Sequence, residues 1–124
     1  MVEVVVAKRL VLIVSISRNE LENLANSLVK EGYESLGATS LDEIDNALQQ
    51  ADKITLALID ITDFDESVWA RCDQLRQARV PYIVITPSRA VNIPQMCVQY
   101  SASAAMVKPV DSRSLVAVIQ ALLV

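Results

Sequence analysis

The chain has 124 residues, of which 52% are hydrophobic and 4% aromatic, and its net charge is -4. This length suits one domain, and a core of Val, Leu, Ile and Ala suits a parallel sheet covered on both faces. The acidic balance argues against nucleic-acid binding through a basic patch, and the lack of histidine removes the usual general base and the commonest metal ligand.

The first predicted strand covers residues 10–14, and a helix follows over residues 18–31 because its apolar residues recur with the spacing of one helical face. Ser17 and Glu20 predict a capping box at the start of this helix. Gly32 predicts a left-handed turn at its end.

Strands and helices continue to alternate along the rest of the chain. Four further strands are predicted, over residues 33–38, 54–60, 82–86 and 105–108. A helix opened by a Ser40–Glu43 capping box follows the first of these, and a helix carrying Val68, Trp69, Cys72 and Leu75 follows the second. The third is followed by a loop over residues 87–91 and a helix capped by Asn92 with Pro94 in its first turn, and the fourth by a last helix capped by Asp111 and carrying Leu115, Val118, Ile119 and Leu122. This alternation predicts one α/β domain over residues 1–124, with a doubly wound five-stranded parallel sheet. Residues 1–8 either lengthen the first strand or form a flexible N-terminal extension.

Polar side chains end three of the predicted strands. Asp60 closes the third strand, Thr86 the fourth and Lys108 the fifth. Because the carboxyl ends of parallel strands border one functional crevice, we expect these side chains to share a site. The first strand ends in Ser15, where a metal site would need acidic residues.

The order of these residues, and the Lys108–Pro109 pair after an apolar strand, give the chain a family resemblance. It resembles the CheY-like receiver domains of two-component response regulators over nearly its whole length. The resemblance implies the flavodoxin-like (βα)5 fold with strand order 2-1-3-4-5. It implies that Asp60 is the phosphoacceptor, that Thr86 swings toward the phosphoryl group, and that Lys108, followed by Pro109, contacts the phosphoryl oxygens.

The chain departs from the receiver pattern at several positions, three of which bear on metal binding and switching. Ser15 and Ile16 occupy the places of the acidic pair that holds Mg²⁺ in the family, and Ala105 occupies the place of the switch aromatic. Mg²⁺ takes octahedral oxygen ligands, usually with one or two carboxylates. Asp60, with the Thr62 backbone as the remaining candidate ligand, is a poor site, so we expect no cofactor unless phosphorylation is retained. The chain is therefore interpreted as a degenerate receiver, or pseudo-receiver.

Without a metal between them, Asp60 and Lys108 should face each other directly or through a water. That arrangement would favour ionised Asp60. Asp63 and Asp65 in the following loop are an alternative source of cation ligands, but their expected role is to start the third helix.

The leading functional hypothesis is a non-enzymatic signal-transduction receiver of the two-component or phosphorelay type. It would act through a histidine kinase, phosphotransfer or effector domain, with weak or no Mg²⁺-dependent phosphorylation. The alternative is a working phosphoacceptor modified at Asp60. A lesser alternative is a small nucleotide-binding α/β domain, although Gly32 and Gly37 are the only glycines and form no phosphate-binding loop.

The last helix carries apolar residues beyond one face, because Val116 and Leu123 join its inward set. With the fifth strand it is interpreted either as a homodimer or partner surface or as a fraying end.

No apolar run approaches the roughly 18 residues of a membrane span. Cys72 and Cys97 are interpreted as small buried residues of a reducing compartment. We expect a cytoplasmic protein whose domain contacts neither membrane nor nucleic acid.

Overall fold

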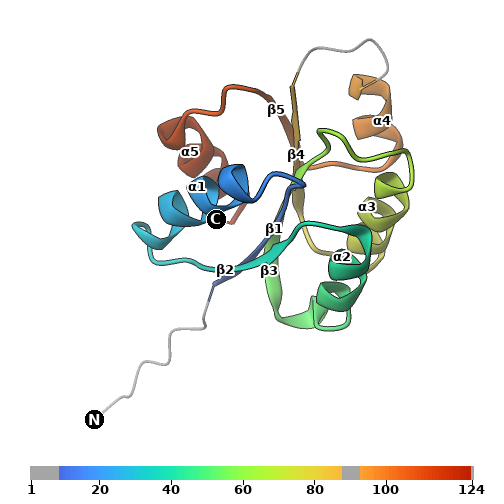
Figure 1. Cartoon of the computed structure of the whole chain (residues 1–124), viewed down its shortest axis with the longest axis horizontal. Coiled ribbons are helices and arrows are strands. Elements are labelled where there is room, and N and C mark those ends of the chain that lie inside the picture. The colour runs from blue at the N-terminus through green and yellow to red at the C-terminus, as the bar shows by residue number, and fades with distance from the viewer. Residues whose placement is uncertain (1–8, 88–92, 124) are drawn as a thin grey trace.

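In a computed structural model that describes residues 9–87 and 93–123, five parallel strands form one sheet in the order β2-β1-β3-β4-β5 (Figure 1). The predicted fold class and strand order are therefore confirmed. The strands are β1 (Leu10–Val14), β2 (Glu34–Ala38), β3 (Ile54–Asp60), β4 (Tyr82–Thr86) and β5 (Ala104–Val107). The helices are α1 (Arg18–Val29), α2 (Leu41–Leu48), α3 (Val68–Gln77), α4 (Ile93–Gln99) and α5 (Ser112–Leu122).

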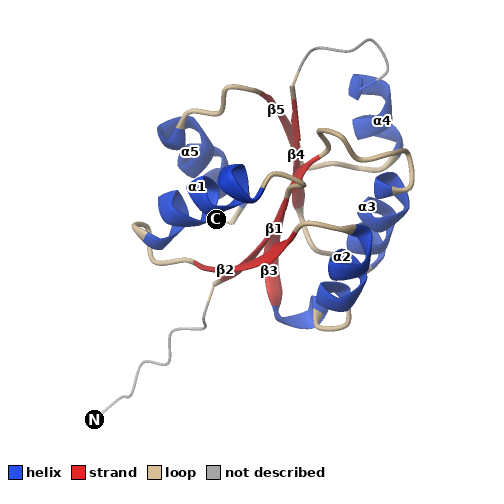
Figure 2. Cartoon of the chain, in the orientation of Figure 1, coloured by secondary structure: helices blue, strands red, loops and turns tan. Residues whose placement is uncertain are grey.

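Helices cover both faces of the sheet, as Figure 2 shows. Alternate residues of a strand point to opposite faces, and the two sets of side chains enter two separate clusters. In β4, Tyr82 and Val84 join the side chains of α2 and α3, whereas Ile83 and Ile85 join those of α1 and α5. Near-continuous apolar strands are thus explained by burial on both faces.

Local signals in the sequence set the ends of α1. The Ser17 hydroxyl accepts a hydrogen bond from the Glu20 N–H at 3.3 Å, as an N-cap does. Gly32 has a φ of 84°, and the Tyr33 N–H reaches back to the Leu28 carbonyl at 3.1 Å. Gly32 therefore ends the helix in the left-handed turn that the sequence predicts.

Three details differ from the sequence-based expectations or lie outside the described residues. The sequence did not predict the 3₁₀ turn over Ala51–Lys53. Cys72 is buried as expected, but Cys97 is only half-buried, because α4 presents it at the edge of the core. The expected N-terminal extension over residues 1–8, most of the loop over residues 87–91 and the Asn92 cap fall outside the part of the chain that the structure describes.

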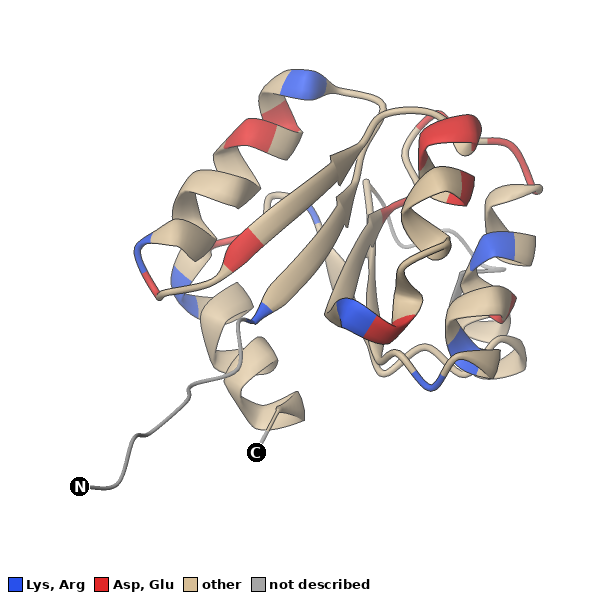
Figure 3. Ribbon diagram, turned by 90° about the horizontal axis from the view of Figure 1, so that it is seen from below, with Lys and Arg blue, Asp and Glu red and all other residues tan. Residues whose placement is uncertain are grey.

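Charged residues lie mainly on the helices and loops around the sheet (Figure 3). One pair joins two helices, since the Arg71 guanidinium of α3 contacts Asp45 of α2 at 3.0 Å. Among residues 9–87 and 93–123, no helix has the length and apolar character to cross a bilayer.

Candidate functional site

Asp60 is a buried carboxylate at the carboxyl end of β3, with 1% of its surface exposed. Three donors reach it from three segments. The Thr62 N–H lies 3.0 Å from Oδ1, the Ser15 hydroxyl lies 3.3 Å from Oδ2, and the Lys108 ammonium lies 2.7 Å from Oδ2. A buried carboxylate needs such donors because desolvation penalises its charge.

The backbone places Lys108 next to Asp60. Its N–H donates to the Thr86 carbonyl at 2.8 Å, which extends the pairing of β5 with β4 by one residue. The side chain then turns toward the α1 face, as do Ala104 and Met106 of β5, which pack in the cluster on that face. The direct Asp60–Lys108 contact is one of the two arrangements expected from the sequence.

The Lys108 ammonium contacts a second carboxylate as well. Its Nζ lies 2.6 Å from Oε2 of Glu20, which projects from the first turn of α1. One cation therefore bridges two acids that lie far apart in the sequence. The summed formal charge of Glu20, Asp60 and Lys108 is negative by one, and Glu20 is the outer of the two acids, with 44% of its side chain exposed.

These contacts shift the pKa values of Asp60 and Lys108 so that each side chain favours its charged state. Burial raises the pKa of Asp60, but the hydrogen bonds from Lys108 and Thr62 outweigh burial and hold that pKa below its usual value. Burial lowers the pKa of Lys108, but its bonds to Asp60 and Glu20 outweigh burial and raise that pKa. The ion pair is therefore charged on both sides at neutral pH.

Sequence reasoning missed Glu20 as a site residue. The capping box predicts that its carboxylate returns to the backbone of Ser17, and only half of that motif forms. The Ser17 hydroxyl caps the helix, while the Glu20 carboxylate turns to Lys108. The sequence held a weak signal for this role, because the helix after β1 begins near the carboxyl ends of the strands and Glu20 lies in its first turn.

The two positions expected to hold a metal in receivers do not form a metal site in this chain. Ser15 is buried, but its hydroxyl donates a hydrogen bond to Asp60. Ile16 has an apolar side chain that is 43% exposed. Among the described residues, no group of three or more Asp, Glu, Cys or His side chains is placed to hold a metal ion. Because Mg²⁺ takes several oxygen ligands and Lys108 already neutralises Asp60, these residues do not fit Mg²⁺.

Of the remaining predicted site residues, Thr86 and Pro109 adjoin Lys108, whereas Ala105 does not. Thr86 is buried at the end of β4 and holds the Lys108 backbone through its carbonyl. Pro109 follows Lys108 and lines the cavity described next. Ala105 lies on β5 with its surface exposed. The Thr62 hydroxyl is buried next to Asp60.

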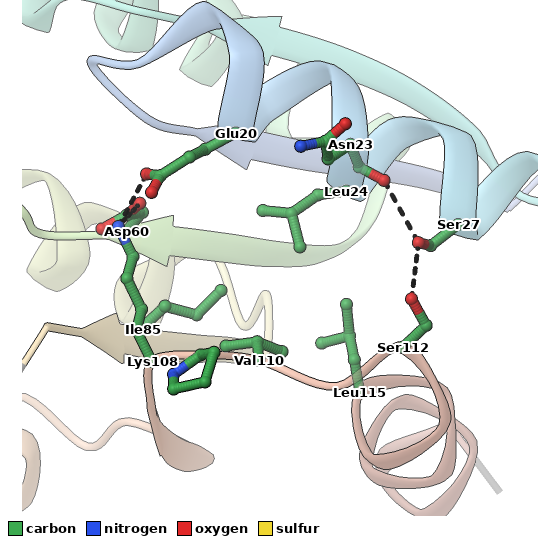
Figure 4. A pocket seen from close by; sticks show the side chains of 11 residues that line it. Glu20, Asn23, Leu24, Ser27, Asp60, Ile85, Lys108, Val110, Ser112 and Leu115 are labelled. Carbon is green, nitrogen blue, oxygen red and sulfur yellow. Dashed lines mark hydrogen bonds and ion pairs between the residues drawn. The ribbon is translucent and has the colours of Figure 1, made fainter.

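A cavity of about 480 Å³ lies between α1 and α5 and is called the α1–α5 cavity below (Figure 4). Glu20, Asp60 and Lys108 form its charged end. Its apolar wall is made by Leu24, Ile85, Val110 and Leu115. At the far end, the hydroxyls of Ser27 and Ser112 lie 2.9 Å apart and join the two helices. The site thus continues from an ion pair into an apolar space.

The geometry defines a doubly wound α/β domain with a carboxylate, a hydroxyl residue and a lysine at the carboxyl edge of its sheet. No family model matches the chain, and no curated protein matches it. Solved structures do. A response regulator receiver protein from Pseudomonas putida superposes with a TM-score of 0.83 at 24% identity, covering 94% of this chain and 99% of that one.

Two further solved structures give the same result. A CheY-like receiver domain from Methanospirillum hungatei has a TM-score of 0.80 at 24% identity and covers 94% of each chain. A response regulator from Thermotoga maritima has a TM-score of 0.82 at 19% identity, covering 94% of this chain and 98% of that one. At these identities the likeness establishes the fold, which is that of receiver domains.

Proposed function

We propose that this chain is an atypical receiver module of a two-component or phosphorelay system, and that it works by binding protein partners in the cytoplasm rather than by catalysis. The observation that carries the proposal is the direct contact of Lys108 with Asp60, at 2.7 Å, in a pocket that lacks the acidic pair. The receiver-like position of Asp60, Thr86 and Lys108 supports the class. Ser15 and Ile16 support weak or absent Mg²⁺-dependent phosphorylation.

The physical reason is electrostatic. Transfer of a phosphoryl group to a carboxylate brings two negative groups together, and a metal normally neutralises the charge that develops. Here the cation beside Asp60 is an ammonium already paired with two carboxylates. Loss of such charge stabilisation commonly lowers a rate by roughly a hundredfold or more.

Beryllofluoride with Mg²⁺, which mimics the phosphoryl group, tests this proposal by NMR. We expect no saturable shifts at Asp60 and Thr86 in the wild type. The matched variant is Ser15→Asp/Ile16→Asp, which restores two carboxylates and should gain Mg²⁺-dependent shifts. Asp60→Asn in the restored background should lose them. Saturable shifts in the wild type would instead establish the alternative, a working phosphoacceptor.

We propose that the partner surface includes β5 and α5, and that a second copy of the chain is one partner for it. Val107 on β5 is 39% exposed, and Ala105, two residues earlier on the same face of the strand, is also exposed. This face is opposite to that of Ala104 and Met106, which pack with α1 and α5, so these two residues support the β5 part of the surface. Apolar residues that lie together on a surface mark interaction sites better than single ones do.

Val107→Glu tests the surface, and Val29→Glu is its control, because Val29 is a more exposed valine, at 62%, on α1 instead of β5. Sedimentation should show that only Val107→Glu dissociates the dimer. A wild type that stays monomeric at high concentration would refute the homodimer. A histidine kinase, phosphotransfer or effector domain would then be the partner to test on the same surface.

A further inference from the structure

The α1–α5 cavity has the size and lining of a small-molecule site. Its volume of about 480 Å³ lies within the range of roughly 300–1,000 Å³ that is usual for such sites. Leu24, Val110 and Leu115 form an apolar wall, and the charged groups converge at one end only. This is the arrangement in which an apolar body is buried while a few polar contacts fix its orientation.

The charged end already holds a carboxylate in the position that a ligand would use. Oε2 of Glu20 lies 2.6 Å from the Lys108 ammonium at the edge of the cavity. Glu20 is on the outer side of the ion pair and is 44% exposed, so its side chain can rotate into water without unfolding α1. Asp60, in contrast, is buried and hydrogen-bonded by Thr62 and Ser15.

Replacing the Glu20 carboxylate by another carboxylate leaves the charge beside Lys108 unchanged. The exchange costs little, because a partly exposed ion pair contributes little to stability. Burial of an apolar body against Leu24 and Leu115 then favours the incoming acid. An amine has no such exchange available, since the Lys108 ammonium already occupies the position between the two acids.

The length of the cavity limits the size of this acid. The cavity follows α1 from Glu20 to Ser27, which is about 10 Å at the helical rise of 1.5 Å per residue. The hydrogen bond between Ser27 and Ser112 lies across its far end. A carboxylate with a body of a few carbon atoms fits this distance.

We propose that the α1–α5 cavity binds a small amphipathic carboxylate, whose acid group replaces Glu20 on Lys108 and whose apolar body lies against Leu24, Val110 and Leu115. Such a ligand would free Glu20 and the first turn of α1 from the β5–α5 connection. A small-molecule site goes beyond the proposed protein–protein function and does not depend on it.

Four probes test the proposal by NMR titration of the whole chain: hexanoate, hexylamine, hexanol and acetate. We expect saturable shifts along α1 and the start of α5 with hexanoate, and much weaker binding of the other three. Equal binding of hexylamine would overturn the role of Lys108. Equal binding of acetate would overturn the role of the apolar wall. No binding of hexanoate would overturn the proposal as a whole.

Three variants and one control variant locate the ligand. Lys108→Met should weaken hexanoate binding at least about tenfold, because a charge-assisted bond is lost. Glu20→Gln should strengthen it by about two- to fivefold, because the internal competitor loses its charge. Ser27→Phe should block the far end, whereas Asn26→Phe, its exposed neighbour on α1 outside the cavity, should not.

Unchanged affinity in both Glu20→Gln and Ser27→Phe would place the ligand elsewhere and refute the assignment. Glu20 and Ser27 make only partly exposed or exposed contacts, so these variants should fold even if Lys108→Met is unstable. The wild-type response to beryllofluoride has no bearing on these titrations, so the two proposals can fail separately.

Discussion

Removal of the Lys108 charge should leave a buried carboxylate without its cation. In Lys108→Met the side-chain volume is roughly kept, but Asp60 remains 1% exposed with only Thr62 and Ser15 as donors. Removing one partner of a buried ion pair costs about 3–5 kcal/mol. Lys108 is itself 21% exposed and two donors remain, so we expect a smaller loss than this range, about 2–3 kcal/mol.

For a chain of 124 residues, this loss corresponds to a Tm lower by roughly 8–12 °C. The assay is urea or thermal unfolding of the wild type, Lys108→Met, Asp60→Asn and the double variant. Because replacing both partners removes the unpaired charge, the double variant should be more stable than Lys108→Met. The loss in the double variant minus the sum of the losses in the two single variants measures the coupling between the two side chains.

The pH dependence of the unfolding free energy supplies an independent check, because it should have opposite signs in the wild type and in Lys108→Met. In the wild type the folded pKa of Asp60 lies below its unfolded value, so its stabilisation is present above about pH 4 and is lost as the pH falls. In Lys108→Met burial dominates and the folded pKa rises, so the variant loses stability as the pH rises. The gap between the two proteins should therefore narrow at acid pH.

A difference in unfolding free energy between the two proteins that stays constant from neutral to acid pH would refute this reasoning, because the ionisation of Asp60 would then not be the cause of the lost stability. A loss below about 0.5 kcal/mol at neutral pH, the size expected of a surface pair, would refute it as well.

Three further predictions concern the fold. Gly32→Ala should lower the free energy of unfolding by about 1 kcal/mol, because a Cβ disfavours its φ of 84°; denaturant titration measures this. Ser17→Ala should remove about 1 kcal/mol as the N-cap is lost, and a Ser17→Thr variant should recover most of it. Cys72, whose pKa burial raises to about 12, should resist iodoacetamide in the native state, whereas the half-buried Cys97 reacts first in a mass-spectrometric time course.

The elements and the sheet were predictable because their signals are local. Continuous apolar runs indicate strands that are buried on both faces, and Ser17 and Gly32 mark the ends of α1 within a few residues. The alternation of strands and helices then indicates a parallel sheet. Asp60, Thr86 and Lys108 could be brought together from this alone, since each ends a strand at the same edge.

The contact between Glu20 and Lys108 could not be predicted in the same way. It joins residues 88 positions apart, and it depends on how the β5–α5 connection lies against α1. The local rule for Glu20, a capping box, predicted a different partner. The exposed state of Ile16 and the half-buried Cys97 likewise depend on packing that no spacing in the sequence reveals.

Lys108 also determines how the resting site responds to its surroundings. A counter-ion that is a side chain is present in fixed stoichiometry, and neither dialysis nor a chelator removes it. Because Asp60 is buried, added salt screens the pair only slightly. If the proposed function holds, the resting form of this edge of the sheet should not depend on the supply of divalent ions, and changes in the charge of Lys108 or Asp60 should alter it.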